Sequence, residues 1–174
     1  MTMMTISQES YRSRKSPDNK FLADVSRTHI FVYDISGIAP ILIDQIFFQN
    51  PNQVCFSPSN QLLGVRSTSG RLLVYSLLTH ETVFLQKRTR TSEGSALYFL
   101  DENTLFFSDW DGKIYIFSVP SAKLTLLHHF QENDMRTPVI LANGDKEWIM
   151  FGSVPMNNDE KIETEKYRLS LSSG

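Results

Sequence analysis

The sequence has little that would mark a secreted, membrane-spanning or disulfide-stabilised protein. It contains a single cysteine, Cys55, so no disulfide can form within the chain. No apolar run approaches the roughly 20 residues that cross a bilayer, and residues 1–15 lack the apolar core of a signal peptide. We therefore expect a cytoplasmic protein in which Cys55 is a small buried side chain within a strand.

An excess of charge of either sign is also missing. The formal net charge is −2, from 17 basic and 19 acidic residues. This balance gives no long-range attraction to polyanions, so we do not expect the chain to bind nucleic acid or a membrane. With 174 residues, 41% of them hydrophobic, the chain can bury a core as one domain without help from a metal.

Residues that would form a catalytic or metal site do not gather at any point. The four histidines, none of which stands at a metal-ligand spacing from another histidine or the cysteine, are His29, His80, His128 and His129. Residues 108–112, SDWDG, contain only part of an acidic calcium loop and are typical of a turn between strands. We therefore expect no enzyme activity, no cofactor and no metal.

What the sequence does contain is a repeated pattern. A Ser-Pro turn is followed by an apolar strand, a polar or glycine-containing turn, and a second apolar strand that ends on an aromatic residue. The pattern is clearest in residues 56–76, FSPSNQLLGVRSTSGRLLVYS, and recurs in residues 16–34 and 99–118. The closing aromatic residues stand 42 positions apart: Tyr33, Tyr75 and Phe117. A repeat of this length is typical of a β-propeller built from four-stranded blades.

Strands are predicted throughout three repeats and in part of a fourth. In chain order they are 20–26, 29–35 and 40–48; 52–57, 61–67, 71–77 and 81–87; 94–100, 104–108, 113–119 and 123–130; then 138–142 and 147–153. Asn143 and Gly144 suit a tight hairpin between the last two. After a polar loop, residues 165–171 could add one more strand.

The third strand of each repeat is apolar on both faces, as in residues 72–75, Leu-Leu-Val-Tyr, and residues 114–117, Ile-Tyr-Ile-Phe. In a sheet with one solvent-exposed face, apolar and polar residues would alternate along each strand instead. Sheets stacked face to face explain the pattern, which favours a propeller over a sandwich. An up-and-down barrel is the weaker alternative, because it would alternate and needs no 42-residue repeat.

Residues 16–34, 56–76 and 99–118 resemble WD repeats, and the resemblance extends over about residues 16–151. The repeats end in Tyr-Asp, Tyr-Ser and Phe-Ser rather than the family's Trp-Asp, so the chain is similar to a divergent WD-like propeller. The fold class we expect is all-β, an incomplete array of about four four-stranded antiparallel blades. The resemblance implies a rigid platform for a protein partner.

The predicted organisation has three parts. Residues 1–15 are an N-terminal segment that could supply a closing strand, residues 16–153 are the blades, and residues 154–174 are a polar loop with a last strand. Family propellers have about seven blades, so the ring would close with four blades, be completed by a second copy or another chain, or stay an open arc. Bare sheet faces and strand edges promote association, so we expect a homo-oligomer or a partner.

Five residues are predicted to bind a partner: Trp110, Arg66, Lys87, Arg88 and Arg90. An indole in a rim turn is a common anchor, and the clustered charges could meet a phosphate, an acidic protein or RNA. Arg66 could face a central channel, or it could pair with Asp24 or Asp109 at the same level of an adjacent blade.

The leading hypothesis is a non-catalytic protein-interaction module that presents its rim to a partner protein. The alternative is a small bacterial immunity or accessory protein that neutralises an effector. A propeller enzyme is the third reading, and it would need His128 or Asp109 among catalytic groups at the channel mouth.

Overall fold

The structure is a computed structural model, and it describes residues 13–86, 94–109, 111, 113–129, 139–143, 147–153 and 164–170. These residues form strands and turns, and among them there is no helix with the length and apolar character to span a membrane. The strands make three four-stranded antiparallel sheets and one three-stranded sheet. This confirms the predicted all-β, propeller-like array.

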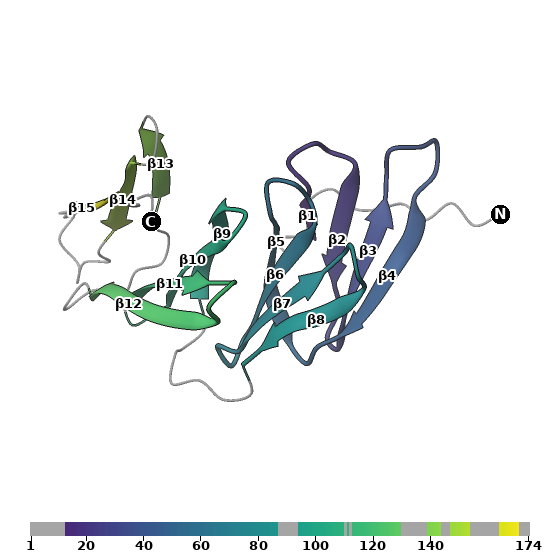
Figure 1. Cartoon of the computed structure of the whole chain (residues 1–174), viewed down its shortest axis with the longest axis horizontal. Helices are drawn as coiled ribbons and strands as arrows, with labels where there is room; N and C mark the ends of the chain where they lie inside the picture. Colours follow the sequence, from purple (N-terminus) through teal and green to yellow (C-terminus); the bar gives the residue numbers. More distant parts are fainter. Residues whose placement is uncertain are drawn as a thin grey trace, which may run out of the picture.

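The sheets follow one another along the chain (Figure 1). The first contains β1 (Ser13–Lys15), β2 (Phe21–Val25), β3 (His29–Asp34) and β4 (Ile41–Phe47). The second contains β5 (Pro51–Phe56), β6 (Leu62–Ser67), β7 (Leu72–Ser76) and β8 (Glu81–Leu85). The third contains β9 (Gly94–Asp101), β10 (Thr104–Asp109), β11 (Lys113–Ser118) and β12 (Lys123–His129). The last contains β13 (Val139–Asn143), β14 (Glu147–Ser153) and β15 (Thr164–Ser170).

Strand boundaries agree with the predictions to within about two residues, because turn residues mark both ends of most strands. β1 lies in the N-terminal segment and pairs with β2, with Arg14 opposite Ala23. The first sheet therefore has its own fourth strand. The division of the chain at residues 15 and 153, and a ring-closing role for the N-terminal segment, stay predictions.

The sheets stack with their first strands together. β5 contacts β1, β2 and β9, and β6 also contacts β9. Arg14 of β1 even reaches the third sheet, where its Nη1 donates a hydrogen bond of 3.3 Å to the carbonyl oxygen of Leu97. The fourth strands β4 and β8 are mostly exposed. This radial order, with inner strands converging and outer strands in solvent, is that of propeller blades.

Two apolar clusters fill the spaces between the sheets. The cluster between the first and second sheets contains Ala23, Val25, Ile30, Val32, Ile46, Phe48, Val54, Phe56, Leu63, Val65, Leu73 and Tyr75. The cluster between the second and third sheets contains Cys55, Leu72, Val74, Leu97, Leu105, Phe107, Tyr115 and Phe117. The second sheet is covered on both faces, and β7 is buried along its whole length. This explains the continuous apolar run in that strand.

The Ser-Pro turns close the first hairpin of the first two sheets in the same way. Ser16 Oγ accepts a hydrogen bond of 2.9 Å from the amide of Phe21, and Ser57 Oγ accepts one of 3.1 Å from Leu62. Both serines are buried, so these bonds satisfy polar groups that water does not reach. Asn19 and Asn60 complete the turns in the left-handed conformation, which asparagine tolerates.

Candidate interaction surface

Antiparallel strand order places the turns at two opposite ends of the sheets. The turns that follow β1, β3, β5, β7, β9 and β11 share one end, which we call the Ser-Pro rim. The turns that follow β2, β6 and β10, together with the connection from β4 to β5, share the other end. At that second end the amide of Asn50 donates to the carbonyl of Arg27 at 2.8 Å, and the amide of Thr68 donates to that of Asn50 at 3.0 Å. These bonds join the turns of the first and second sheets at that end.

Basic side chains lie along this second end. Arg27 is exposed in the turn after β2, Arg71 follows the turn after β6, and Lys113 begins β11. We call this end the basic rim. The guanidinium of Arg71 donates to the carbonyl of Gln49 at 3.3 Å and lies 4.9 Å from the centroid of the Phe48 ring. Arg71 is thus held in place over a buried ring while part of its surface remains open.

The Ser-Pro rim carries mainly acidic side chains. They are Asp18, Asp34, Glu81, Asp101 and Glu102, against the basic Lys15, Lys20 and Lys123. The basic rim also carries the exposed Asp111, against Arg27, Arg71 and Lys113. Among the described residues the two rims therefore differ in the sign of their net charge. A charge asymmetry of this kind orients an oppositely charged partner toward one rim.

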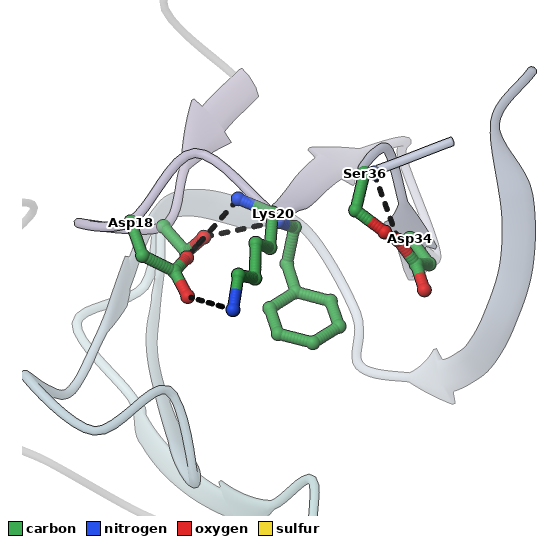
Figure 2. Close-up of polar contacts among 6 residues, drawn as sticks. Asp18, Lys20, Asp34 and Ser36 are labelled. Atoms are coloured by element: carbon green, nitrogen blue, oxygen red, sulfur yellow. Dashed lines mark hydrogen bonds and ion pairs between the residues drawn. The ribbon is translucent and has the colours of Figure 1, made fainter. Parts of the chain in front are cut away.

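Two of these carboxylates are fixed by nearby hydroxyl groups (Figure 2). The Ser16 hydroxyl donates to Asp18 at 2.7 Å, and the Ser36 hydroxyl donates to Asp34 at 2.6 Å. These bonds lower the pKa of both carboxyl groups, since they favour the ionised form. Lys20 lies 3.9 Å from Asp18 but is well exposed, so the pair adds little stability.

Arg66 lies beneath the basic rim, between the second and third sheets. It is fully buried. Its Nη1 donates to the carbonyl of Ser108 at 3.0 Å, and its guanidinium lies 4.4 Å from the centroid of the Phe107 ring. Its Nη2 donates to the carbonyl of Gly70 at 3.4 Å, so Arg66 joins the hairpin of one sheet to the next.

Asp109 is the charged neighbour of Arg66 in the third sheet. It is also fully buried, and its Oδ1 accepts a hydrogen bond of 2.9 Å from the amide of Lys113. Burial raises the pKa of Asp109, and the charge of Arg66 partly opposes that rise. Of the two acidic residues expected as partners of Arg66, Asp109 is therefore the one whose charge interacts with it. Asp24 instead accepts a hydrogen bond of 2.8 Å from Ser13.

The predicted partner-binding residues have different positions. Trp110, Lys87, Arg88 and Arg90 lie outside the described residues, and their role stays a prediction. The strands that precede them, β10 and β8, both run toward the basic rim. Arg66 has no exposed surface, so any effect on a partner would act through the turns that it holds.

Sequence reasoning overlooked Arg27 and Arg71 as rim residues. Each lies in or beside the turn between the second and third strands of its repeat. The available signal was at Arg71 and Lys113, which stand 42 positions apart, the same spacing as the closing aromatic residues. At the Ser-Pro rim, a hydrogen bond of 2.8 Å between His80 Nδ1 and Asp44 Oδ2 joins the second sheet to the first. No group of three or more His, Cys, Asp or Glu side chains in the described ranges could hold a metal.

Comparison with known proteins assigns the fold. No known protein family and no curated protein matches the sequence. Solved structures do match, and they show that the fold is that of a WD-like propeller. One of them is the crystal structure of RRP9 WD40 repeats, with a TM-score of 0.65 and 12% sequence identity. The match covers 87% of this chain and 47% of that chain, so the chain spans about half the length of that structure.

Proposed function

We propose that this protein is a non-catalytic protein-interaction module that binds a partner protein through its basic rim. The observation that carries the proposal is the set of Arg27, Arg71 and Lys113 on one rim, where backbone hydrogen bonds join the turns of the first and second sheets. A rigid, positively charged surface favours a partner with an acidic surface, because complementary charge speeds association and selects the partner. The propeller fold supports a platform role of this kind.

The proposal includes the residues predicted from the sequence. Lys87, Arg88 and Arg90 would add to the positive charge, and Trp110 would supply an apolar anchor. Arg66 would act as a positioning residue beneath the surface. A cytoplasmic location and self-association are further parts of the proposal, and the first sheet offers a surface for self-association.

A pull-down with matched charge reversals tests the proposal. The test variant is Arg27→Glu with Lys113→Glu, and the control is Lys20→Glu with Lys123→Glu on the Ser-Pro rim. We expect the test variant to weaken capture of acidic partner proteins on the order of tenfold, with wild-type binding falling as salt rises. The control should retain them. Circular dichroism checks the fold of each variant.

Equal capture by wild type and test variant would contradict the basic rim as the binding surface. Loss in the control alone would assign binding to the opposite rim. Arg71→Glu is kept as a separate variant, because Arg71 also packs on Phe48 and its loss would affect stability.

A further inference from the structure

The first sheet has one face covered by the second sheet and one face against which no other described sheet packs (Figure 1). We infer that this free face is an interface to a second copy of the chain, packed face to face through the same residues in both copies. The inference rests on the self-association included in the proposed function and specifies its surface, its symmetry and the residues in contact.

The repeat shows what kind of surface this face is. In the second and third sheets, the residues that point to the preceding sheet are Leu63, Val65, Leu73 and Tyr75, and Leu105, Phe107, Tyr115 and Phe117. Strand register puts Leu22, Asp24, Phe31 and Tyr33 at these places in the first sheet. The free face is therefore the counterpart of two faces that the fold buries.

Exposure differs between the free face and its counterparts along the third strand. The eight counterparts are at most 8% exposed, whereas Phe31 and Tyr33 are only partly buried. Leu22, on the inner strand β2, is 4% exposed, so the accessible part of the face lies on β3 and β4. Across the next strand pair, Tyr33 faces Leu42 and His29 faces Phe47, and these two apolar side chains are 48% and 70% exposed. Solvent-exposed aromatic and aliphatic groups that adjoin one another mark a surface that gains from being covered.

Aromatic rings give this face a defined shape. The ring of His29 lies 5.9 Å from the ring of Phe31 and 5.4 Å from the ring of Phe47, measured between centroids. Such a group presents a large apolar area with little side-chain entropy left to lose. A second flat sheet face is the natural shape to cover it, as the two internal junctions show.

Charge identifies the second copy as the occupant. Asp24 stands where Val65 and Phe107 stand in the other sheets, so this face carries a carboxylate that its counterparts lack. Lys15 lies on the same face, opposite Leu22 in the pairing of β1 with β2. A face with one acid and one base beside an apolar centre is self-complementary. Under a two-fold axis, Lys15 of each copy can meet Asp24 of the other.

The experiment measures molar mass in solution by light scattering over a range of protein concentrations. Wild type is expected to be a dimer, and Phe47→Asp a monomer, since a charge at this exposed position disrupts the contact without opening the core. Val83→Asp, at an exposed position on β8 of the second sheet, is the matched control and should remain dimeric. A monomeric wild type, or a dimeric Phe47→Asp, would overturn the inference.

Charge exchange tests the symmetry of the contact. Lys15→Glu alone and Asp24→Lys alone place like charges together and should each weaken the dimer about tenfold or more. The double variant restores opposite charges only if the two residues meet across a two-fold axis, so it should recover the wild-type dissociation constant. Failure to recover would refute face-to-face packing and indicate a head-to-tail contact, as in ring closure.

The outcomes also separate this inference from the proposed function. Variants of the free face leave the basic rim intact, so they should keep the rim partner while losing the dimer. Arg27→Glu with Lys113→Glu should do the opposite. A protein that loses both properties in every variant would have lost its fold, which circular dichroism reports directly.

Discussion

Gly64 is the point at which the stacking of the second and third sheets can be tested most sharply. A Cβ atom built at Gly64 would lie 2.8 Å from Leu105 Cδ2 and 3.1 Å from Cys55 Sγ. It would also lie 3.3 Å from Phe99 Cε2. Favourable contact between carbon atoms needs about 3.5–4.0 Å. Gly64→Ala must therefore push three side chains away, and Leu105 among them is fully buried.

Two effects of opposite sign decide the magnitude. Overpacking a buried site costs about 1–3 kcal/mol, whereas replacing glycine by alanine within a strand gains about 0.5–1 kcal/mol. We expect Gly64→Ala to lower the free energy of unfolding by about 0.5–2 kcal/mol, and Gly64→Val to lower it further. Leu105→Ala alone should cost about 2–5 kcal/mol, because it leaves a cavity.

The double variant gives the decisive comparison. In Gly64→Ala with Leu105→Ala, the new methyl group occupies space that the leucine has left. The loss of unfolding free energy in the double variant should therefore be smaller than the sum of the two single losses by about 1 kcal/mol or more. Urea denaturation of the four proteins, followed by circular dichroism, measures the coupling. Strictly additive costs, or a stabilising Gly64→Ala, would refute the close approach of the two sheets at this point.

Ala23 supplies the control for this reasoning. It faces Val32 in the first sheet as Gly64 faces Val74 in the second, and it is fully buried between the first two sheets. A methyl group is accommodated there, so Ala23→Gly should destabilise the protein. Gly64→Ala and Ala23→Gly are opposite exchanges at equivalent places, and both are thus expected to destabilise the protein.

Two further predictions follow from burial. Burial raises the pKa of Cys55 to about 12. The thiol of the native protein should therefore react only slowly with an aromatic disulfide reagent at pH 8, and fully once denaturant is added. Fast labelling of the native protein would contradict the position of Cys55 between the sheets. Burial also raises the pKa of Tyr75 and of Tyr115 to about 12, from 10. Between these values the folded state holds more protons than the unfolded state, so stability should fall as pH rises from 10 to 12, and Tyr75→Phe or Tyr115→Phe should make that fall less steep in alkaline urea titrations.

The sequence was sufficient to predict most strands and the way in which sheets repeat. An apolar residue on each face of a strand is a local signal of two-sided burial, and turn residues such as Asn60 and Gly70 mark where strands end. These signals arise between residues of one hairpin, so they can be recognised without knowing which other sheets pack against that hairpin.

The strand β1 could not be predicted as part of the first sheet. Its residues, Ser-Arg-Lys, have no apolar pattern. They form a strand because the free edge of β2 offers backbone partners and because Arg14 finds the carbonyl of Leu97 two sheets away. Contacts that distant in the chain leave no local trace in the sequence.

The candidate surface could likewise be predicted from the sequence only in part. The basic residues of the turns are visible in the sequence, but which turns share a rim depends on the direction of every strand before them. Arg66 shows the limit most clearly, since an arginine in a strand is most often solvent-exposed. The Phe107 ring and the Ser108 carbonyl of the third sheet, together with the Gly70 carbonyl, show why it is buried.

The amino-acid sequence by itself determined the blades, because each blade is a hairpin meander whose periodicity and turns act over a few residues. Tertiary structure alone decided which faces are covered, which charges share a rim and which carboxylate is buried. Those properties depend on the stacking of sheets about 42 residues apart in the chain, and stacking brings together residues that no local pattern connects.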